Sequence, residues 1–255
     1  MLLQGKVAIV TGASRGIGKA IAKEFVNQGA TVAFTYRSSS EAASILEQEL
    51  SAGGGVVRGF QSDAASMTDA ESLVGKVLEA FGAVDIIINN AGIIRDGLLV
   101  KKSRRTGELK KMPLEQLTSV LDVNLVGATL MVREVAGQMI ESETKPGVIV
   151  NISSIARHGS RGQTNYVAAK AALAANTTTW MRELAPYGIR VGAVAPGMIE
   201  TPMTEGMKQS ARDALVASIP LGRIGTPEDI WQAVKFVCEC DYFSGRTIDV
   251  DGVTP

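Results

Sequence analysis

The fold is decided by one stretch, Val7-Ala8-Ile9-Val10-Thr11-Gly12-Ala13-Ser14-Arg15-Gly16-Ile17-Gly18, in which a short apolar run enters a glycine-rich turn. Ile17, Ile21 and Phe25 then recur at helical spacing, which predicts a strand, a tight turn and a helix. Glycines let the backbone approach a ligand closely, and the helix N-terminus presents free N–H groups to a pyrophosphate. The spacing is G-x-x-x-G-x-G, not G-x-G-x-x-G, and an ordinary strand–helix connection is the alternative. Its position after the first strand favours a nucleotide site. The expected contacts are Gly12, Ser14, Arg15, Gly16, Ile17 and Gly18.

Outward from this turn, short β-branched runs alternate with helical segments. The runs are Val7–Val10, Thr31–Thr35, Val56–Phe60, Val84–Ile88, Val148–Ile152, Ile189–Val194 and Thr247–Val250. They are nearly continuous in apolar character, as strands covered on both faces are. The pattern predicts an α/β fold, a doubly wound Rossmann-type seven-stranded parallel sheet with helices on both faces. No repeat or linker divides the chain, so we expect a single domain over residues 1–255.

Composition bears on partners and location. Lys and Arg together number 26, as do Asp and Glu, so no net field favours nucleic acid or an anionic membrane. No stretch approaches the roughly 20 apolar residues of a membrane span, and the N-terminus does not read as a signal peptide. Cys238 and Cys240 are the only cysteines and His158 the only histidine. We therefore expect no metal, and a reduced, cytoplasmic enzyme.

The end of the second strand, Thr35-Tyr36-Arg37-Ser38-Ser39, bears on the choice of dinucleotide. An NAD enzyme places an acid there for the ribose 2′-hydroxyl, and this chain has none. Arg37, with Arg15, would attract a 2′-phosphate, and Ser38 could donate a hydrogen bond. The segment favours NADP(H), the alternative being an Arg37 side chain free in solvent. After the third strand, Asp63-Ala64 could receive the adenine amino group, unless Asp63 is merely an exposed loop residue.

Tyr166-Val167-Ala168-Ala169-Lys170 places a phenol and an amine on one face of a helix. A phenol with a pKa of about 10 is a reluctant proton donor at neutral pH. A neighbouring ammonium lowers that pKa towards the range in which a general acid works well. Such pairs also occur on exposed helix surfaces without any function. The motif therefore indicates a catalytic site only if a cofactor site, a hydroxyl and a polar helix residue lie beside it.

The fourth strand ends in Asn89-Asn90-Ala91-Gly92, where small residues let the backbone pass close to a ribose and Asn90 can brace it. TGxxxGxG, NNAG and YxxxK, in this order and spacing, resemble the short-chain dehydrogenase/reductase family across essentially the whole chain. TGASRGIG, NNAGIIRDGLL, QTNYVAAKAAL, APGMIETPM and GRTIDVDG are similar, more narrowly, to its 3-oxoacyl-[acyl-carrier-protein] reductase branch. The resemblance implies NADPH-dependent reduction of a 3-oxoacyl thioester to the 3-hydroxyacyl form in fatty acid synthesis, by a homotetramer.

The resemblance also implies residue roles. Tyr166 would give a proton to a ketone, and Lys170 would lower the pKa of Tyr166 and hold the nicotinamide ribose. Asn124 would sit at a helix kink and hold a water that links Lys170 to solvent; a buried asparagine satisfied by backbone is the alternative. Further cofactor contacts would come from Asn90, Ala91, Gly92, Pro196, Gly197, Ile199 and Thr201, together with Tyr166 and Lys170.

The hydroxyl that polarises the carbonyl is expected at the end of the fifth strand, Asn151-Ile152-Ser153-Ser154. Ser153 matches the family's usual spacing to Tyr166, whereas Ser154 matches by strand position and needs a one-residue deletion in the following loop, which loops tolerate. The two side chains face opposite sides. We choose Ser154 and keep Ser153 as the alternative. His158, in that loop, is expected at the rim.

Two further segments concern substrate. Thr201 to about Gly225 resembles a substrate lid, where Met203 and Met207 would suit an acyl chain or simply pack. Residues 101–111 are longer and more basic than the family's usual link, with six cations among eleven residues. They form either a mobile solvated loop or a dock for an acidic carrier protein, a phosphopantetheine or a coenzyme A phosphate. The ends of the two central helices, Glu141-Ser142-Glu143 and Glu183-Leu184-Ala185-Pro186, lack the arginines that carrier-dependent relatives tend to show.

Two rival functions remain. One keeps the chemistry and changes the substrate to a secondary alcohol, a sugar or acetoacetyl-CoA. The other is a non-catalytic NADP-binding subunit, against which the combination of Asn124, Ser154, Tyr166 and Lys170 argues.

Overall fold

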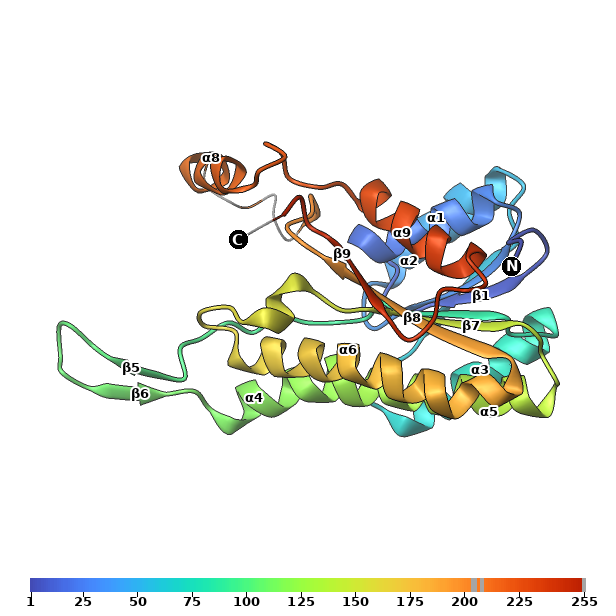
Figure 1. Cartoon of the computed structure of the whole chain (residues 1–255), viewed down its shortest axis with the longest axis horizontal. Helices are drawn as coiled ribbons and strands as arrows, with labels where there is room; N and C mark the ends of the chain where they lie inside the picture. Colours follow the sequence, from blue (N-terminus) through green and yellow to red (C-terminus); the bar gives the residue numbers. More distant parts are fainter. Residues whose placement is uncertain (203–205, 207–208, 254–255) are drawn as a thin grey trace.

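A computed structural model describes residues 1–202, 206 and 209–253, and its seven-stranded sheet is the predicted one (Figure 1). The strands are β1 (Val7–Val10), β2 (Thr31–Tyr36), β3 (Val57–Gln61), β4 (Ile86–Asn89), β7 (Gly147–Ile152), β8 (Ile189–Pro196) and β9 (Thr247–Val250). Their order is β3-β2-β1-β4-β7-β8-β9, and every neighbouring pair is parallel. The Rossmann-type fold class is therefore confirmed.

The strand order reverses between β1 and β4, which lie side by side although β2 and β3 intervene in the chain. In open parallel sheets, ligands bind outside the carboxyl ends of the strands at such a switch point. The register pairs Val10 with Ile88, so Thr11 and Asn89 follow at the same edge. The turn after β1, the Asn90 loop and the Ser153-Ser154 pair after β7 are thereby brought to one side of the sheet.

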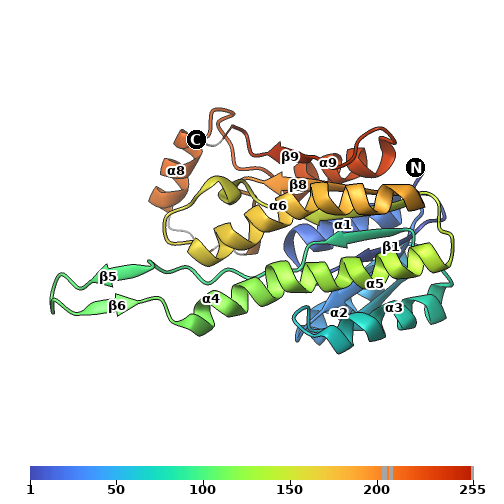
Figure 2. The same cartoon turned by 60° about the horizontal axis from the view of Figure 1, so that its bottom comes forward.

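Helices cover both faces of the sheet (Figures 1 and 2). One face packs against α1 (Gly16–Asn27), α2 (Ser40–Ala52) and α9 (Pro227–Glu239). Phe25 of α1 meets Trp231 of α9 edge to face, with ring centroids 5.0 Å apart. The other face packs against α3 (Met67–Phe81), α5 (Gly127–Glu141) and α6 (Thr164–Leu184). Burial of both faces explains why the strands read as continuous apolar runs.

The helix that begins with α4 (Leu114–Leu121) continues into α5 through a π-helical turn at Asp122–Val126. A π-turn inserts one extra residue into a helix and is common at functional sites. Asn124 lies in this turn and is buried. The local irregularity agrees with the kink that the family resemblance implies at this position.

Residues 100–111 form an exposed β-hairpin, where a loop was the alternative to a docking segment. β5 (Val100–Lys102) pairs antiparallel with β6 (Leu109–Lys111). The tip is closed by backbone hydrogen bonds from Ser103 to Glu108 and from Gly107 to Ser103, with Gly107 at a φ of 72° that favours glycine. Figures 1 and 2 show the hairpin standing out from the body of the protein before α4.

The segment predicted as a lid contains α8 (Gln209–Ser218), whereas Met203 and Met207 lie outside the described residues. Thr226 and Asp229 form a capping box at the start of α9, with Pro227 in the first turn. Two 3₁₀ turns, Ile155–His158 and Ala185–Tyr187, complete the described elements. Within the described ranges, no helix is both long and apolar enough to cross a membrane.

Candidate active site

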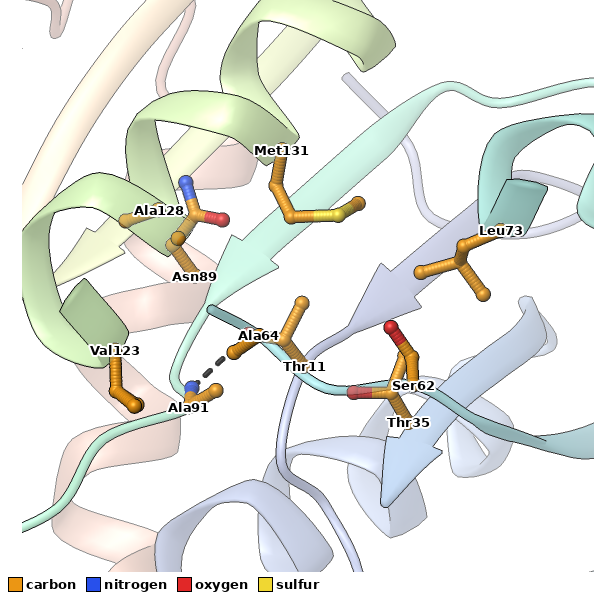
Figure 3. A pocket seen from close by; sticks show the side chains of 11 residues that line it. Thr11, Thr35, Ser62, Ala64, Leu73, Asn89, Ala91, Val123, Ala128 and Met131 are labelled. Carbon is orange, nitrogen blue, oxygen red and sulfur yellow. Dashed lines mark hydrogen bonds between the residues drawn. The ribbon is translucent and has the colours of Figure 1, made fainter. Parts of the chain in front are cut away.

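Thr11 and Asn90 lock the glycine-rich turn to the loop after β4. The Thr11 hydroxyl accepts hydrogen bonds from the backbone N–H groups of Asn90 and Ala91, each at 3.0 Å, and Figure 3 draws the bond to Ala91. The Asn90 side-chain amide donates to the carbonyl oxygens of Thr11 and Gly12, at 2.9 and 3.1 Å. Asn90 was expected to brace this loop, and it does so through the turn itself. The role of Thr11 was not predicted.

Glycines at the crevice are required by close approach of other segments. A Cβ added at Gly12 would lie 2.8 Å from the Ala91 Cα, and one at Gly18 would collide with the Asn90 side chain. One at Gly16 would touch Thr201 Cγ2 at 3.6 Å. The turn, the Asn90 loop and the segment after β8 therefore meet, as the cofactor prediction requires.

Gly92 and Gly127 are also approached closely by other segments of the chain. A Cβ on Gly92 would lie 3.3 Å from Asn124 Oδ1, and one on Gly127 would strike the carbonyl oxygen of Ala64. Gly127 opens α5 and lets that helix reach the loop that carries Asp63 and Ala64. Sequence reasoning missed Gly127, because a glycine in a helical run shows no sign of its distant neighbour.

Figure 3 shows a cavity behind this crevice, lined by residues that include Thr11, Thr35, Ala64 and Ala91. Its volume is about 10 Å³, about the room of one water molecule. An adenine ring does not fit inside it. Ala64 and Ala91, both predicted cofactor contacts, can therefore meet a dinucleotide only at the outer rim of this cavity.

Arg37 and Asp63, predicted to contact different ends of the adenosine, form an ion pair with each other. Arg37 Nε lies 3.1 Å from Asp63 Oδ2, and the Arg37 side chain is 68% exposed. Arg15 and Ser38 are also exposed, whereas Ser14 and Ile17 are half-buried. An exposed ion pair of this kind contributes at most about 1 kcal/mol, so an anion could displace Asp63 from Arg37.

The segment after β8 closes the other side of the crevice. Pro196 ends the strand, and the Gly197 N–H donates to the Val250 carbonyl oxygen at 2.9 Å. Asp251 approaches Gly197 so closely that an added Cβ would lie 2.6 Å from its Cα. Ile199 is buried and forms an isolated bridge with Gly225. Residues of the predicted nicotinamide contact are therefore held by the last strand and by the end of the lid.

Tyr166, Ser154 and Lys170 converge at the carboxyl ends of β7 and β8. The Ser154 side chain is near enough to the Tyr166 phenol to lower its pKa through hydrogen bonding. Lys170 is 3% exposed, and its Nζ lies 5.7 Å from the centroid of the Tyr166 ring. The same Nζ donates a hydrogen bond of 2.6 Å to the Ile152 carbonyl oxygen. Two hydroxyls and an ammonium are thus gathered at one point of the crevice edge.

Burial is the largest influence on the pKa values of Tyr166 and Lys170. Burial raises the pKa of the Tyr166 phenol, the Ser154 hydrogen bond opposes the rise, and the nearby Asp96 carboxylate adds to it. Burial lowers the pKa of Lys170 from 10.5 to about 8. The ammonium donates to the Ile152 carbonyl oxygen and lies 5.7 Å from the centroid of the Tyr166 ring. Lys170 is not among the causes of the shift at Tyr166, and its expected effect on that pKa stays a prediction.

The two serines have separate environments. Ser153 donates to the backbone carbonyl of Lys170 at 2.8 Å and is buried. Ser154 lies at the phenol and accepts a 3.1 Å hydrogen bond from the Ala156 N–H. As strand alternation indicates, only one of the two hydroxyls faces Tyr166. The geometry favours Ser154 as the hydroxyl that can meet a carbonyl, and gives Ser153 the task of holding α6.

Asn124 is held by the loop that follows Asn90. Its Oδ1 accepts from the Ile93 N–H at 2.8 Å, and its Nδ2 donates to the Ile93 carbonyl oxygen at 2.9 Å. This is the arrangement of the alternative interpretation, an asparagine satisfied by backbone. Asn124 therefore positions the Asn90 loop against the π-turn, which is consistent with, and does not require, a role in proton transfer.

Asn165 is a site residue that sequence reasoning missed. It is fully buried and donates to the carbonyl oxygens of Arg95 and Gln116, both at 2.9 Å, while its Oδ1 accepts from the Tyr166 N–H. It thereby fixes the start of α6 against α4. A buried polar residue next to the tyrosine was the available signal.

Arg157 anchors the loop that carries Ser154. Its guanidinium binds both carboxylate oxygens of Asp249 in β9, at 2.6 and 2.9 Å, and donates to the Ser154 carbonyl oxygen at 3.3 Å. His158 is exposed, as predicted for a rim residue. Among the described residues, no three His, Cys, Asp or Glu side chains gather as metal ligands would.

Comparison with known proteins agrees with this geometry. A family model described as enoyl-(acyl carrier protein) reductase matches residues 12–252. The 3-oxoacyl-[acyl-carrier-protein] reductase FabG of Thermotoga maritima is 40% identical over 99% of this chain and 98% of its own length. The 3-oxoacyl-[acyl-carrier-protein] reductase of Synechocystis sp. is 39% identical over 98% of this chain and 97% of its own. The FabG of Staphylococcus epidermidis is 37% identical over 97% and 98%. The chain belongs to the short-chain dehydrogenase/reductase family, whose members are oxidoreductases that use a nicotinamide cofactor.

Proposed function

We propose that this protein uses NADPH to reduce the ketone of a 3-oxoacyl thioester, carried on an acyl carrier protein, in fatty acid synthesis. The observation that carries the proposal is the pairing of the Ser154 and Tyr166 hydroxyls at the carboxyl edge of the sheet. Two donors at one point suit a carbonyl oxygen, whose charge grows as hydride arrives. The names of the relatives support the substrate class.

The start of α1 fits the pyrophosphate of a dinucleotide. Its N-cap residue, Arg15, makes no side-chain capping hydrogen bond, so backbone N–H groups of the first turn can bind an anion. Residues of the turn would hold the pyrophosphate, and the Asn90 loop, Ile199 and Thr201 would hold the nicotinamide half. When bound, the cofactor supplies the hydride.

Catalysis by the chain rests on donors that meet developing charge. Ser154 would hydrogen-bond the carbonyl oxygen, and Tyr166 would give its proton to the alkoxide as that charge forms. Since burial raises the pKa of Tyr166, the phenol keeps its proton at neutral pH until the far more basic alkoxide forms. Lys170 donates one N–H to the Ile152 carbonyl oxygen, and its other two N–H groups would bind ribose hydroxyls.

Preference for NADPH over NADH is proposed from Arg37. No acid stands at the end of β2 to accept a ribose 2′-hydroxyl, and the exposed Arg37–Asp63 pair can open towards a 2′-phosphate. We expect Arg37→Glu to raise KM for NADPH at least about tenfold while KM for NADH changes little, because a repelled phosphate is present only in NADPH. Equal changes for both cofactors would contradict the assignment.

Steady-state rates on a matched set of substrates test the function. The set is one 3-oxoacyl group on acyl carrier protein, on coenzyme A and on pantetheine, a free ketone, a sugar and an enoyl thioester, each with NADPH and NADH. We expect the highest kcat/KM for the 3-oxoacyl thioesters with NADPH. The enoyl arm is included because the matching family model carries that description. Faster reduction of the enoyl thioester, the sugar or the free ketone would replace the proposed substrate.

The single domain over residues 1–255, the lid over about 201–225, the homotetramer and the cytoplasmic location stay predictions. Small residues on α6, among them Ala168, Ala171 and Ala175, are at least partly exposed and would permit close packing against a twin helix.

A further inference from the structure

The β5–β6 hairpin concentrates positive charge on a protein that has none overall. Its cations are Lys101, Lys102, Arg104, Arg105, Lys110 and Lys111, against the single acid Glu108, whereas the whole chain has a net charge of zero. All six side chains are exposed, and within the described part of the chain none forms an ion pair or a side-chain hydrogen bond. The charge on this arm is therefore not neutralised by the protein itself.

The pairing register makes this arrangement costly. Lys101 stands directly opposite Lys110 in the antiparallel pair. Like charges directly opposite each other destabilise a sheet, so stability alone does not favour this sequence. The hairpin is nonetheless held in shape by the bonds at its tip, where the Thr106 N–H also donates to the Ser103 hydroxyl. Repulsion of this kind is relieved when an anionic surface binds.

The two faces of the hairpin differ. Lys101 and Lys110 lie on one face. On the other, Val100 stands opposite Lys111 and Leu109 stands opposite Lys102, so apolar and basic side chains alternate. Val100 is 53% and Leu109 62% exposed. A face on which exposed apolar side chains stand directly beside cations suits a protein surface that offers both anionic and apolar contacts. An isolated phosphate would engage the cations but leave the apolar pair uncovered.

The base of the hairpin is tied to the active site. Gly97 forms a bridge with Gln163, and its N–H donates to the Gly162 carbonyl oxygen at 2.8 Å. The Gln163 side chain donates to the Asp96 carboxylate, and Tyr166 follows three residues later in the chain. A partner seated on the arm would therefore be held through its base to the segment that leads into Tyr166.

We propose that the β5–β6 hairpin is the docking surface for an acidic carrier protein, whose tethered acyl group then enters at Tyr166. The inference rests on the proposed function and names its partner surface. Charge complementarity selects an acidic partner, and the apolar face selects a protein over a free phosphate. A hairpin of a second copy is disfavoured, because two arms with the same excess of cations would repel each other.

The test compares Lys101→Glu/Lys110→Glu with a control of equal charge change, Lys76→Glu/Arg246→Glu, at exposed positions outside the hairpin. Both are assayed on one 3-oxoacyl group attached to acyl carrier protein and to pantetheine. For the hairpin variant we expect KM for the carrier substrate to rise at least roughly tenfold, the lower end of what electrostatic steering contributes to association rates. KM for the pantetheine substrate and kcat for both should stay within twofold of the wild type, roughly the scatter of such assays, because the variant leaves the catalytic groups intact.

A parallel measurement does not depend on turnover. Fluorescently labelled acyl carrier protein is titrated with the wild type and both variants by anisotropy, at low and at high salt. We expect binding that weakens with salt for the wild type and the control, and binding that is lost for the hairpin variant. Equal effects on both substrates, an unchanged carrier KM, or a variant whose elution volume shows altered assembly would each overturn the inference. Failure of the wild type to reduce both thioesters would instead overturn the proposed function, and the anisotropy result would still decide the docking surface.

Discussion

Lys170 is a buried cation that lowers the stability of the fold at neutral pH, and replacing it by methionine should show this. Its pKa falls from 10.5 to about 8 because of burial. The unfolded chain therefore binds the proton more tightly than the folded protein, which costs about 3 kcal/mol of stability at pH 7. Loss of the hydrogen bond to the Ile152 carbonyl offsets about 1 kcal/mol of the gain. We expect Lys170→Met to be about 2 kcal/mol more stable than the wild type at pH 7 and to be inactive.

The sign of the pH dependence separates this explanation from simple repacking. Between about pH 8 and pH 10.5 the folded protein holds fewer protons at this site than the unfolded chain, so wild-type stability rises with pH. The advantage of Lys170→Met should shrink by about 2 kcal/mol between pH 7 and pH 9.5. Urea unfolding at both pH values and one protein concentration measures it, with Lys76→Met at an exposed site as the control. A variant that is less stable at pH 7, or a difference that does not change with pH, would refute the reasoning.

Three further substitutions test the crevice and the last helix. Thr11→Val leaves the N–H groups of Asn90 and the next residue without their acceptor, so it should lower the free energy of unfolding by about 2 kcal/mol or more and raise KM for NADPH, whereas Thr11→Ser should keep both near wild type. Gly18→Ala drives a methyl group into the Asn90 side chain, and about 1–3 kcal/mol of destabilisation with weaker NADPH binding by fluorescence titration is expected; wild-type affinity would contradict the close approach. Asp229→Asn should cost about 1 kcal/mol in thermal unfolding at neutral pH, because Arg223 and the helix cap lower the pKa of Asp229 to about 2. That cost should disappear as the pH falls from about 4 to about 2, and a cost that persists in acid would argue against the ion pair.

Strand positions could be predicted from the sequence because both faces of the sheet are buried. Every predicted run became a strand, with ends that match or differ by at most two residues. Differences of two residues occur at the end of β8 and at the start of β4, which begins at Ile86 and not at Val84. Asp85 precedes it because its carboxylate accepts from the Val7 N–H and from Lys6, an interaction between segments far apart in sequence. Local apolar pattern carries no information about such a partner.

The hairpin and the role of Thr11 could not be predicted, for two different reasons. Residues 100–111 lack a two-residue turn signal, and their strands are only three residues each. The most visible feature of this segment in the sequence is therefore its charge and not its strand pairing. Thr11 acts on Asn90, 79 residues away, and a threonine after a strand is otherwise unremarkable in sequence.

The sequence predicted that two side chains of one helix would be neighbours, but not which groups outside the helix they would contact. The four-residue spacing of Tyr166 and Lys170 correctly predicted that the two side chains would be neighbours. The spacing did not reveal that the Lys170 ammonium would donate to the Ile152 carbonyl oxygen of β7. Nor did it reveal that burial would be the largest influence on the pKa of the Tyr166 phenol. The choice between Ser153 and Ser154 could be narrowed by alternation along β7, but only the position of α6 shows which hydroxyl meets the phenol.

The central claim is that the Tyr166 phenol, paired with Ser154, gives its proton to the reduced carbonyl oxygen. The most direct test is kcat of Tyr166→Phe on a 3-oxoacyl thioester, with NADPH affinity measured on the same preparation by fluorescence titration. Loss of one donor aimed at developing charge typically lowers kcat by about a hundredfold to a thousandfold, and loss of the proton itself should cost at least that much. We predict such a fall in kcat with an unchanged Kd for NADPH. A variant that keeps kcat within tenfold of the wild type, with pH dependence unaltered, would contradict the account.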